Sequence, residues 1–241
     1  MVFSSIPFLY YFLPAVLIVY FLTPRKGKNA VLLIASLLFY GWGEPKYLAV
    51  MLVCTALGYG FGLALGRAGR PGVRKALLAA SVLSSLSFLV YFKYADFFLS
   101  NFNALTGASL PLLQLTLPVG ISFYTFQILS YTVDVYRGEA QVQKNPIDLA
   151  CYVTMFPQLI AGPIVRYTDV AEQLKQRGRG DFQKGASRFL VGLGKKILLA
   201  NLLGEVCAAW RGTQNGSVLF SWLYAVSYTL HIYFDFSGYS D

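Results

Sequence analysis

The sequence predicts an all-α, polytopic membrane protein. Its 241 residues are 56% hydrophobic and only 13% charged, whereas soluble domains carry about 25% charged residues. The mean hydropathy is +0.54, and several apolar runs approach the roughly 20 residues that a helix needs to cross a bilayer. Basic residues gather between these runs, as they do in cytoplasmic loops under the positive-inside rule.

The apolar runs give the expected order of membrane segments. They cover residues 6–22, 30–42, 46–65, 77–92, 115–136, 147–165, 189–210 and 218–236. The run 30–42 is short for a crossing and could instead form half of a helical hairpin with 46–65. Residues 166–184 are polar and basic, and 170–174 are amphipathic enough for a helix on the membrane surface. Small residues that allow close helix approach occur at Gly58, Gly60, Gly62 and Gly66.

The distribution of the net charge of +9 predicts the orientation. Basic clusters lie at 25–28, at 67–75 and from 166 to 196. Because such clusters stay in the cytoplasm, the first loop places the N-terminus on the extracytoplasmic side. Two crossings then return the chain at the second cluster, so the charge rule agrees with the span count. We therefore expect membrane lipids as partners and no nucleic acid.

Cysteines and local motifs give no sign of a bound metal or cofactor. Cys54, Cys151 and Cys207 lie in apolar surroundings without metal-ligand spacing, so we expect small core residues. The sequence contains no phosphate-binding loop, dinucleotide fingerprint, zinc signature or Gly-x-Ser-x-Gly elbow. We therefore expect no bound metal and no bound cofactor.

The apolar run 153–166 is the most unusual segment. Pro157 and the Gly162–Pro163 pair forbid one unbroken helix, because proline removes a backbone donor and clashes with the preceding turn. Broken backbone at membrane depth is tolerated only where it is buried in protein or lines a wet cavity. Gln158 and Arg166 add polarity to the break. This segment is therefore predicted to form part of a site.

Ionisable residues within spans mark further candidates, because charge is expensive there. Asp134 lies near the inner end of its span. It could be a channel-lining carboxylate, but we favour a carboxylate that is paired with Arg137 or bound by water at the interface. Asp235 lies among aromatic residues, four residues after His231, so the two share a helix face. They form either an acid–base pair or, as we favour, a polar contact between helices.

Uncharged polar side chains are also present. Gln127, Ser130 and Thr132 lie in the span 115–136, where hydroxyls usually bond their own helix or a neighbour. The tyrosines best placed to line an interior path are Tyr124, Tyr131, Tyr233 and Tyr239.

Three motifs resemble conserved regions of the bacterial membrane-bound O-acyltransferases. Residues 117–138, LPVGISFYTFQILSYTVDVYRG, resemble the fifth-span region of that family. Residues 156–166, FPQLIAGPIVR, are similar to its broken-helix motif, and residues 232–241, IYFDFSGYSD, to its next signature. The motifs occur in family order, and the match is closest to the alginate O-acetyltransferase branch.

The resemblance implies a ring of transmembrane helices, with broken or re-entrant helices, around a thin central layer and a tunnel. An acetyl group would pass from acetyl-CoA or an acyl carrier to hydroxyls of an extracytoplasmic polysaccharide such as alginate, in the bacterial inner membrane and with accessory acetylation proteins. The substrate-channel candidates are then Gln158, Gly162, Pro163, Arg166, Asp235 and Tyr239.

The chain departs from the family at the expected catalytic residue. Family members carry their histidines after the Gly-Tyr-Ser-Asp motif, and this sequence ends at Asp241. Its one histidine, His231, stands where relatives carry glutamine and is not expected to take the catalytic role. Residues 1–241 are therefore expected to be a single transmembrane domain, the N-terminal half of an acyltransferase, inactive alone. The alternatives are a transporter or channel with a broken-helix substrate path, and a membrane scaffold without activity.

Overall fold

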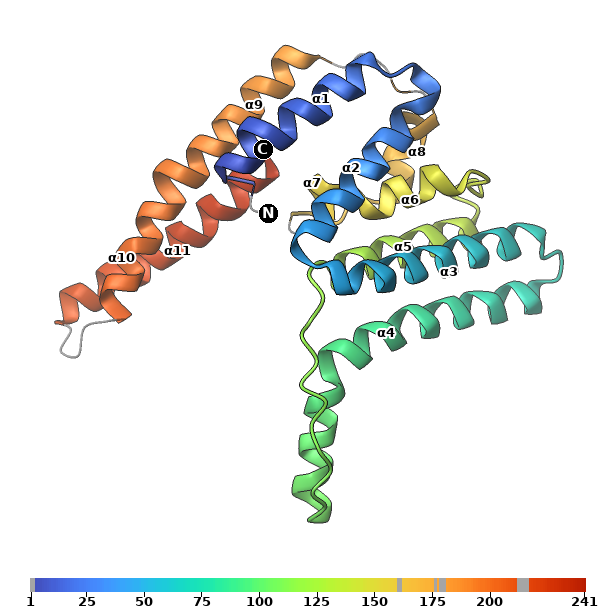
Figure 1. Ribbon diagram of the computed structural model, residues 1–241. Coiled ribbons are helices and arrows are strands. Elements are labelled where there is room, and N and C mark those ends of the chain that lie inside the picture. The colour runs from blue at the N-terminus through green and yellow to red at the C-terminus, as the bar shows by residue number, and fades with distance from the viewer. Residues whose placement is uncertain (1–2, 160–161, 176, 178–180, 212–216) are drawn as a thin grey trace. The chain divides into compact units, whose positions relative to one another are not determined.

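The computed structural model describes residues 3–159, 162–175, 177, 181–211 and 217–241. Every regular element within these ranges is a helix (Figure 1), so the predicted all-α class is confirmed. The described residues group into two compact units. The first contains residues 14–159, 164–175 and 177, and the second contains residues 3–13, 162–163, 181–211 and 217–241.

The first unit consists of a series of helices. They are α1 (Leu13–Leu22), α2 (Lys28–Gly43), α3 (Leu48–Arg67), α4 (Pro71–Thr106), α5 (Ile121–Arg137), α6 (Pro146–Thr154), α7 (Phe156–Leu159) and α8 (Tyr167–Lys175). Helix α3 lies against both α4 and α5 (Figure 1). Helix α5 also packs against α6, α7 and α8, so it is the central element of this unit.

Glycines let α3 approach α5 closely. A Cβ atom added at Gly62 would fall 2.5 Å from the Tyr131 hydroxyl oxygen. Cβ atoms at Gly58 and Gly66 would each fall 2.5 Å from a side chain of α5 or of the segment after it. Gly60, in contrast, has nothing within 4 Å of such an atom. The predicted close approach is therefore confirmed for three of these glycines, and wrong for Gly60.

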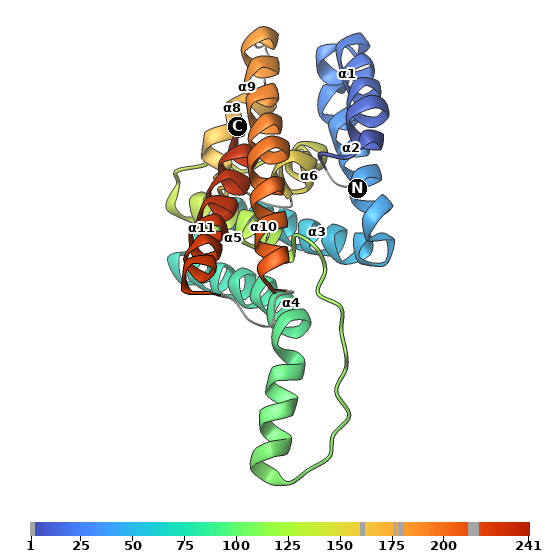
Figure 2. The ribbon, with the colours of Figure 1, turned by 90° about the vertical axis from the view of Figure 1, so that its left-hand side faces the viewer.

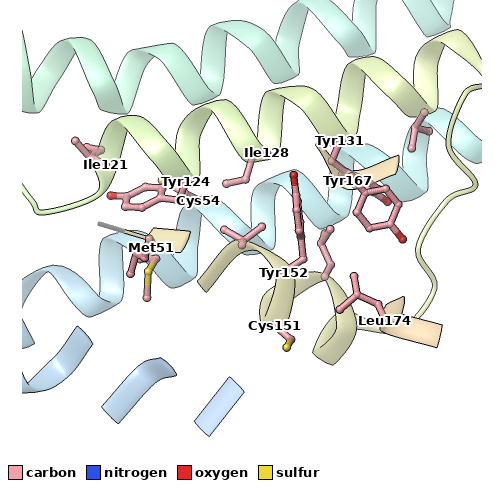
Figure 3. Close-up of a cluster of buried hydrophobic side chains, with 14 of the residues drawn as sticks. Met51, Cys54, Ile121, Tyr124, Ile128, Tyr131, Cys151, Tyr152, Tyr167 and Leu174 are labelled. Carbon is pink, nitrogen blue, oxygen red and sulfur yellow. The ribbon is translucent and has the colours of Figure 1, made fainter. Parts of the chain in front are cut away.

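Tyrosine side chains form much of the core beside α5. Tyr131, Tyr152 and Tyr167 meet edge to face, with ring centroids 4.8 Å apart for Tyr131–Tyr167 and 5.4 Å apart for Tyr152–Tyr167 (Figure 3). The Tyr152 hydroxyl donates to the Val165 carbonyl at 2.7 Å. Tyr124 and Tyr131 are both 0% exposed. This cluster ties α5 to α6, to α8 and to the segment that precedes α8.

Helix α4 extends well beyond its expected end at residue 92. It continues to Thr106, and the irregular segment that follows runs back alongside it (Figure 2). The Asp96 carboxylate accepts from the Leu113 backbone amide at 2.7 Å. The Asn103 side chain bonds both backbone groups of Leu110. These bonds hold the returning segment against the helix.

Helix α5 begins later than the apolar pattern predicts. The expected span starts at residue 115, but the helix starts at Ile121. Pro118 lacks a backbone donor, and Gly120 has a φ of +76°, a left-handed conformation that ends a regular helix. Helix α5 ends as predicted, with Gly138 in the left-handed cap position after Arg137.

The second unit is built on an antiparallel helix pair. Helices α9 (Phe182–Gly194) and α10 (Asn201–Arg211) are joined by a π-helical turn at Lys195–Ala200 into one continuous rod. Helix α11 (Val218–Ser240) lies along this rod (Figures 1 and 2). The rod begins at Phe182, seven residues before the expected start, while α11 begins where predicted. A short π-helix, Pro7–Phe12, belongs to the same unit.

Two described helices are long and apolar enough to cross a membrane. They are Pro45–Arg67 and Pro71–Thr106, with mean hydropathies of 2.0 and 1.7. A shorter apolar helix covers Pro7–Leu22. These helices are consistent with a membrane protein, and the remaining crossings stay predictions. All three cysteines are free and buried, as expected of small core residues.

Candidate functional site

The predicted break in the apolar segment is confirmed, and it lies at Met155. Helix α6 ends at Thr154, and α7 is only four residues long. Pro157 falls in the first turn of α7, where a missing backbone donor is tolerated. The Phe156 amide at the break donates to the Ser36 hydroxyl of α2 at 3.1 Å. Ser36 thus accepts the hydrogen bond that water would accept from a backbone amide at a solvent-exposed break.

Gln158, a predicted candidate, contacts a second buried amide. The Gln127 Nε2 atom on α5 donates to Gln158 Oε1 at 3.4 Å. Gln127 is 1% exposed, while Gln158 is partly exposed. The structure therefore joins a residue of the break to a polar residue of the preceding span.

Arg166 is paired with two carboxylates. Its Nη2 atom lies 2.6 Å from Asp134 Oδ1 and 2.9 Å from Glu139 Oε2. These hydrogen bonds, that to Asp134 first, raise the pKa of the Arg166 guanidinium, so it stays charged. The Asp134 side chain is only 3% exposed. The expected Asp134–Arg137 pair is wrong, because Arg137 lies 3.9 Å from Glu139 instead. Spacing along the sequence could not predict the actual partner of Asp134, because Arg166 lies outside α5.

Arg74 supports the same end of α5. Its Nη2 atom donates to the Tyr136 carbonyl at 2.8 Å, and its Nη1 atom donates to the Leu65 carbonyl at 3.3 Å. It therefore binds the last carbonyls of both α3 and α5, which have no partner within their helices. The sequence marks Arg74 only as one member of a basic cluster, so this role was not predicted.

Gly162 meets Tyr239 within the second unit. Gly162 has a φ of +104°, which residues with a side chain rarely adopt. A Cβ atom there would also fall 3.0 Å from the Tyr239 ring. The bend before the exposed Pro163 therefore requires glycine on two grounds. The structure thus brings together two candidates that are far apart in the sequence.

Asp235 and His231 bind different partners. Asp235 forms an ion pair with Lys196 of the π-helical turn. The His231 Nδ1 atom lies 2.7 Å from the Ala200 carbonyl oxygen; since a carbonyl only accepts, Nδ1 carries the proton. The acid–base pair is therefore not formed, and the favoured interpretation, polar contacts between helices, is confirmed. A second ion pair joins Lys195 to Asp241.

The candidates thus fall into two groups, one in each unit. In the first unit, Gln158 and Arg166 both follow the break and both bind side chains of α5. In the second unit, the group consists of Gly162, Pro163, Asp235 and Tyr239.

Comparison with known proteins identifies relatives along the whole chain. No family model matches. Proteins named "Probable alginate O-acetylase AlgI" from Pseudomonas syringae pv. tomato and Pseudomonas aeruginosa are 44% and 40% identical, over 250 and 248 residues. A protein named peptidoglycan O-acetyltransferase from Helicobacter pylori is 30% identical over 276 residues.

Each match covers 100% of this chain but only 48%, 48% and 52% of those proteins. The chain therefore spans about half the length of the curated relatives that it matches. Over its full length the chain is similar to proteins named probable alginate O-acetylases, and the membrane-bound O-acyltransferases remain the family that its motifs resemble.

Proposed function

We propose that this chain is the N-terminal half of a membrane-bound O-acyltransferase that transfers acetyl groups to hydroxyls of an extracytoplasmic polysaccharide. The observation that carries the proposal is whole-chain similarity to relatives named for two different polymers, alginate and peptidoglycan. Both names describe O-acetyl transfer, so the relatives support the reaction more strongly than they support the identity of the acceptor. Alginate is the favoured acceptor because the alginate O-acetylases are more similar, at up to 44% identity.

The broken segment supports a role in lining the substrate path. Its interruption at Met155 is stabilised by Ser36 from within the protein, as broken backbone at membrane depth requires. The proposed path-lining residues are Gln158, Gly162, Pro163, Arg166, Asp235 and Tyr239. Arg166 faces two carboxylates, so its proposed contribution is to position the segment, not to bind a negatively charged donor.

In the proposed arrangement the protein lies in the bacterial inner membrane with its N-terminus outside. A ring of transmembrane helices with a central tunnel, which the motifs imply, is part of this proposal. The acetyl donor, acetyl-CoA or an acyl carrier, approaches from the cytoplasm, and accessory acetylation proteins act with the enzyme. The basic clusters at 25–28 and 67–75 support the orientation, since such clusters remain cytoplasmic.

The reaction proposed is direct acyl transfer. The acceptor hydroxyl oxygen attacks the acetyl carbonyl carbon, a general base takes the hydroxyl proton, and the donor leaves as a thiol. His231 is engaged with Ala200 and is not proposed as the base. That group is proposed to lie in the other half of the whole protein.

Reconstitution of the full-length protein tests the function. With a labelled acetyl donor and alginate, the protein in liposomes should place label on the polymer, and residues 1–241 alone should place none. Absence of labelled polymer from a correctly inserted full-length protein would contradict the proposal. The transporter hypothesis, which the relatives do not favour, predicts substrate flux without acetylation. Acetyl transfer by the fragment would show that it needs no second half.

A further inference from the structure

A pair of glutamine amides lies beside the break in the first unit. Gln127 comes from α5 and Gln158 from α7, and the hydrogen bond between them is long, at 3.4 Å. We call Gln127 and Gln158 the amide pair. Gln127 is almost wholly buried, whereas Gln158 is partly exposed. The Gln127 side chain is therefore enclosed by protein, whereas the Gln158 side chain is partly accessible from outside.

The enclosed end has an unused hydrogen-bonding atom. Gln127 Oε1 is buried and has no hydrogen-bond partner in the described part of the chain. Buried polar atoms in native proteins nearly always have a partner, which is often a water molecule or a ligand. Exchanging the oxygen and nitrogen positions of both amides would leave a buried N–H group unpaired instead. A hydroxyl group fits either case, because it both donates and accepts.

The surroundings of the amide pair favour an uncharged occupant. Ile128 and Leu159, the chain neighbours of the two glutamines, are 2% and 0% exposed. The buried carboxylate on the same helix, Asp134, is seven residues away, about 10 Å along an α-helix, and is bound by Arg166. An ion placed beside Gln127 would lose its hydration without gaining an opposite charge. A neutral hydroxyl loses far less.

We propose that the amide pair binds a neutral hydroxyl group of the polysaccharide acceptor. This inference rests on the proposed function and adds Gln127 to the residues that meet the substrate. In the predicted orientation α5 enters the membrane from the extracytoplasmic side, where the acceptor is. Gln127 lies in the second turn of α5, and Asp134 lies nearer the cytoplasmic end. The amide pair is therefore on the acceptor's side of the helix.

Substitution of either glutamine by leucine in the full-length protein tests the proposal. Gln127→Leu and Gln158→Leu keep a similar side-chain volume but remove the hydrogen-bonding groups. Thr132→Val is the matched control, because the Thr132 hydroxyl is buried on the same helix but bonds only carbonyls of its own helix. Acetyl transfer is measured in liposomes against rising concentrations of alginate oligosaccharides, and separately against rising donor concentrations.

Each leucine variant should lower kcat/KM for the oligosaccharide about tenfold, the effect of one lost hydrogen bond to a bound group. The KM for the donor and the kinetics of Thr132→Val should stay unchanged. The double variant should lose little more than the worse single variant, because the two amides act on one group. If Gln127→Leu fails to insert, Gln127→Asn withdraws the amide by one methylene group and should give the same acceptor-specific loss.

A buried water is the other source of a hydroxyl. In that case the leucine variants would change the melting temperature and leave the acceptor kinetics unchanged, which would overturn the proposal. Equal losses for donor and acceptor would also overturn it, because they indicate a general defect. If the unaltered full-length protein transfers no acetyl group, the proposed function itself fails, and this outcome is distinct from an active protein that is indifferent to Gln127.

Discussion

Arg166 donates to the Asp134 carboxylate at 2.6 Å, between residues that are 32 positions apart. The carboxylate is almost fully buried, while half of the arginine side chain is exposed. The same guanidinium nitrogen also reaches Glu139. The end of the broken segment is therefore attached to the last turn of α5, and the buried charge of Asp134 is balanced by a residue from outside its helix.

Loss of Arg166 should destabilise the protein more than loss of Arg137. Arg166→Gln leaves the buried Asp134 carboxylate without its cation, which is far more costly than losing an exposed pair. Arg137 is 61% exposed and lies 3.9 Å from Glu139, so Arg137→Gln should change little. Thermal unfolding in detergent measures both variants. Adding Asp134→Asn to Arg166→Gln should restore part of the lost stability; strictly additive losses would argue against the pairing.

The glycines of α3 provide a matched pair of substitutions. Gly62→Ala places a methyl group against the Tyr131 hydroxyl, and such overpacking costs about 1–3 kcal/mol. Gly60→Ala meets no atom within 4 Å and should stabilise the helix by up to about 1 kcal/mol. The free energy of unfolding should therefore change in opposite directions. Equal changes at the two positions would mean that α3 and α5 do not pack closely at Gly62.

Gly162→Ala should be destabilising for two separable reasons. Alanine at a φ of +104° is strained by about 1–3 kcal/mol, and its methyl group would also press on the Tyr239 ring. Tyr239→Ala should relieve the contact but not the strain. The double variant should thus regain only part of the stability in an unfolding titration, while Pro163→Ala serves as the neighbouring control. Full recovery of stability in the double variant would show that the whole loss comes from the contact with Tyr239 and none from backbone strain.

Thiol labelling tests the orientation. The native cysteines are all buried, so a cysteine introduced at an exposed position should label above a low background. Ser109→Cys should react with a membrane-impermeant maleimide in intact cells. Lys26→Cys and Arg70→Cys should react only after the membrane is opened, because they lie in the basic clusters predicted to be cytoplasmic. Labelling of Lys26→Cys in intact cells would contradict the proposed topology, because it would place the first basic cluster outside the cytoplasm.

The sequence predicted the helices and their ends better than the contacts between helices. Pro24 and Gly138 mark real helix ends, after Leu22 and Arg137, since their effects on the backbone are local. The late start of α5 shows that the conformation of Gly120 outweighs an apolar run. The full length of α4 was missed because the apolar run ends at residue 92, whereas the helix continues through polar residues such as Asp96 that bind the returning segment.

The candidate site was predictable only in part. The break was evident from Pro157, but its location at Met155 depends on Ser36 of another helix. Gln158 and Arg166 were recognised as polar residues in an apolar context. Their partners on α5, Gln127 and Asp134, are set by tertiary packing. A single sequence contains no distance information of that kind.

The π-helical turn at Lys195–Ala200 has a consequence for how this part of the chain can vary. The Asn201 amide bonds to Lys196 five residues back, so the turn contains one more residue than an α-helix would. It lets Lys196 reach Asp235 while Gly204 still faces His231. Deleting one residue there would rotate everything beyond it by about 100°. Length is thus more constrained than residue identity in this turn, and homologues should tolerate substitutions there far more readily than insertions or deletions.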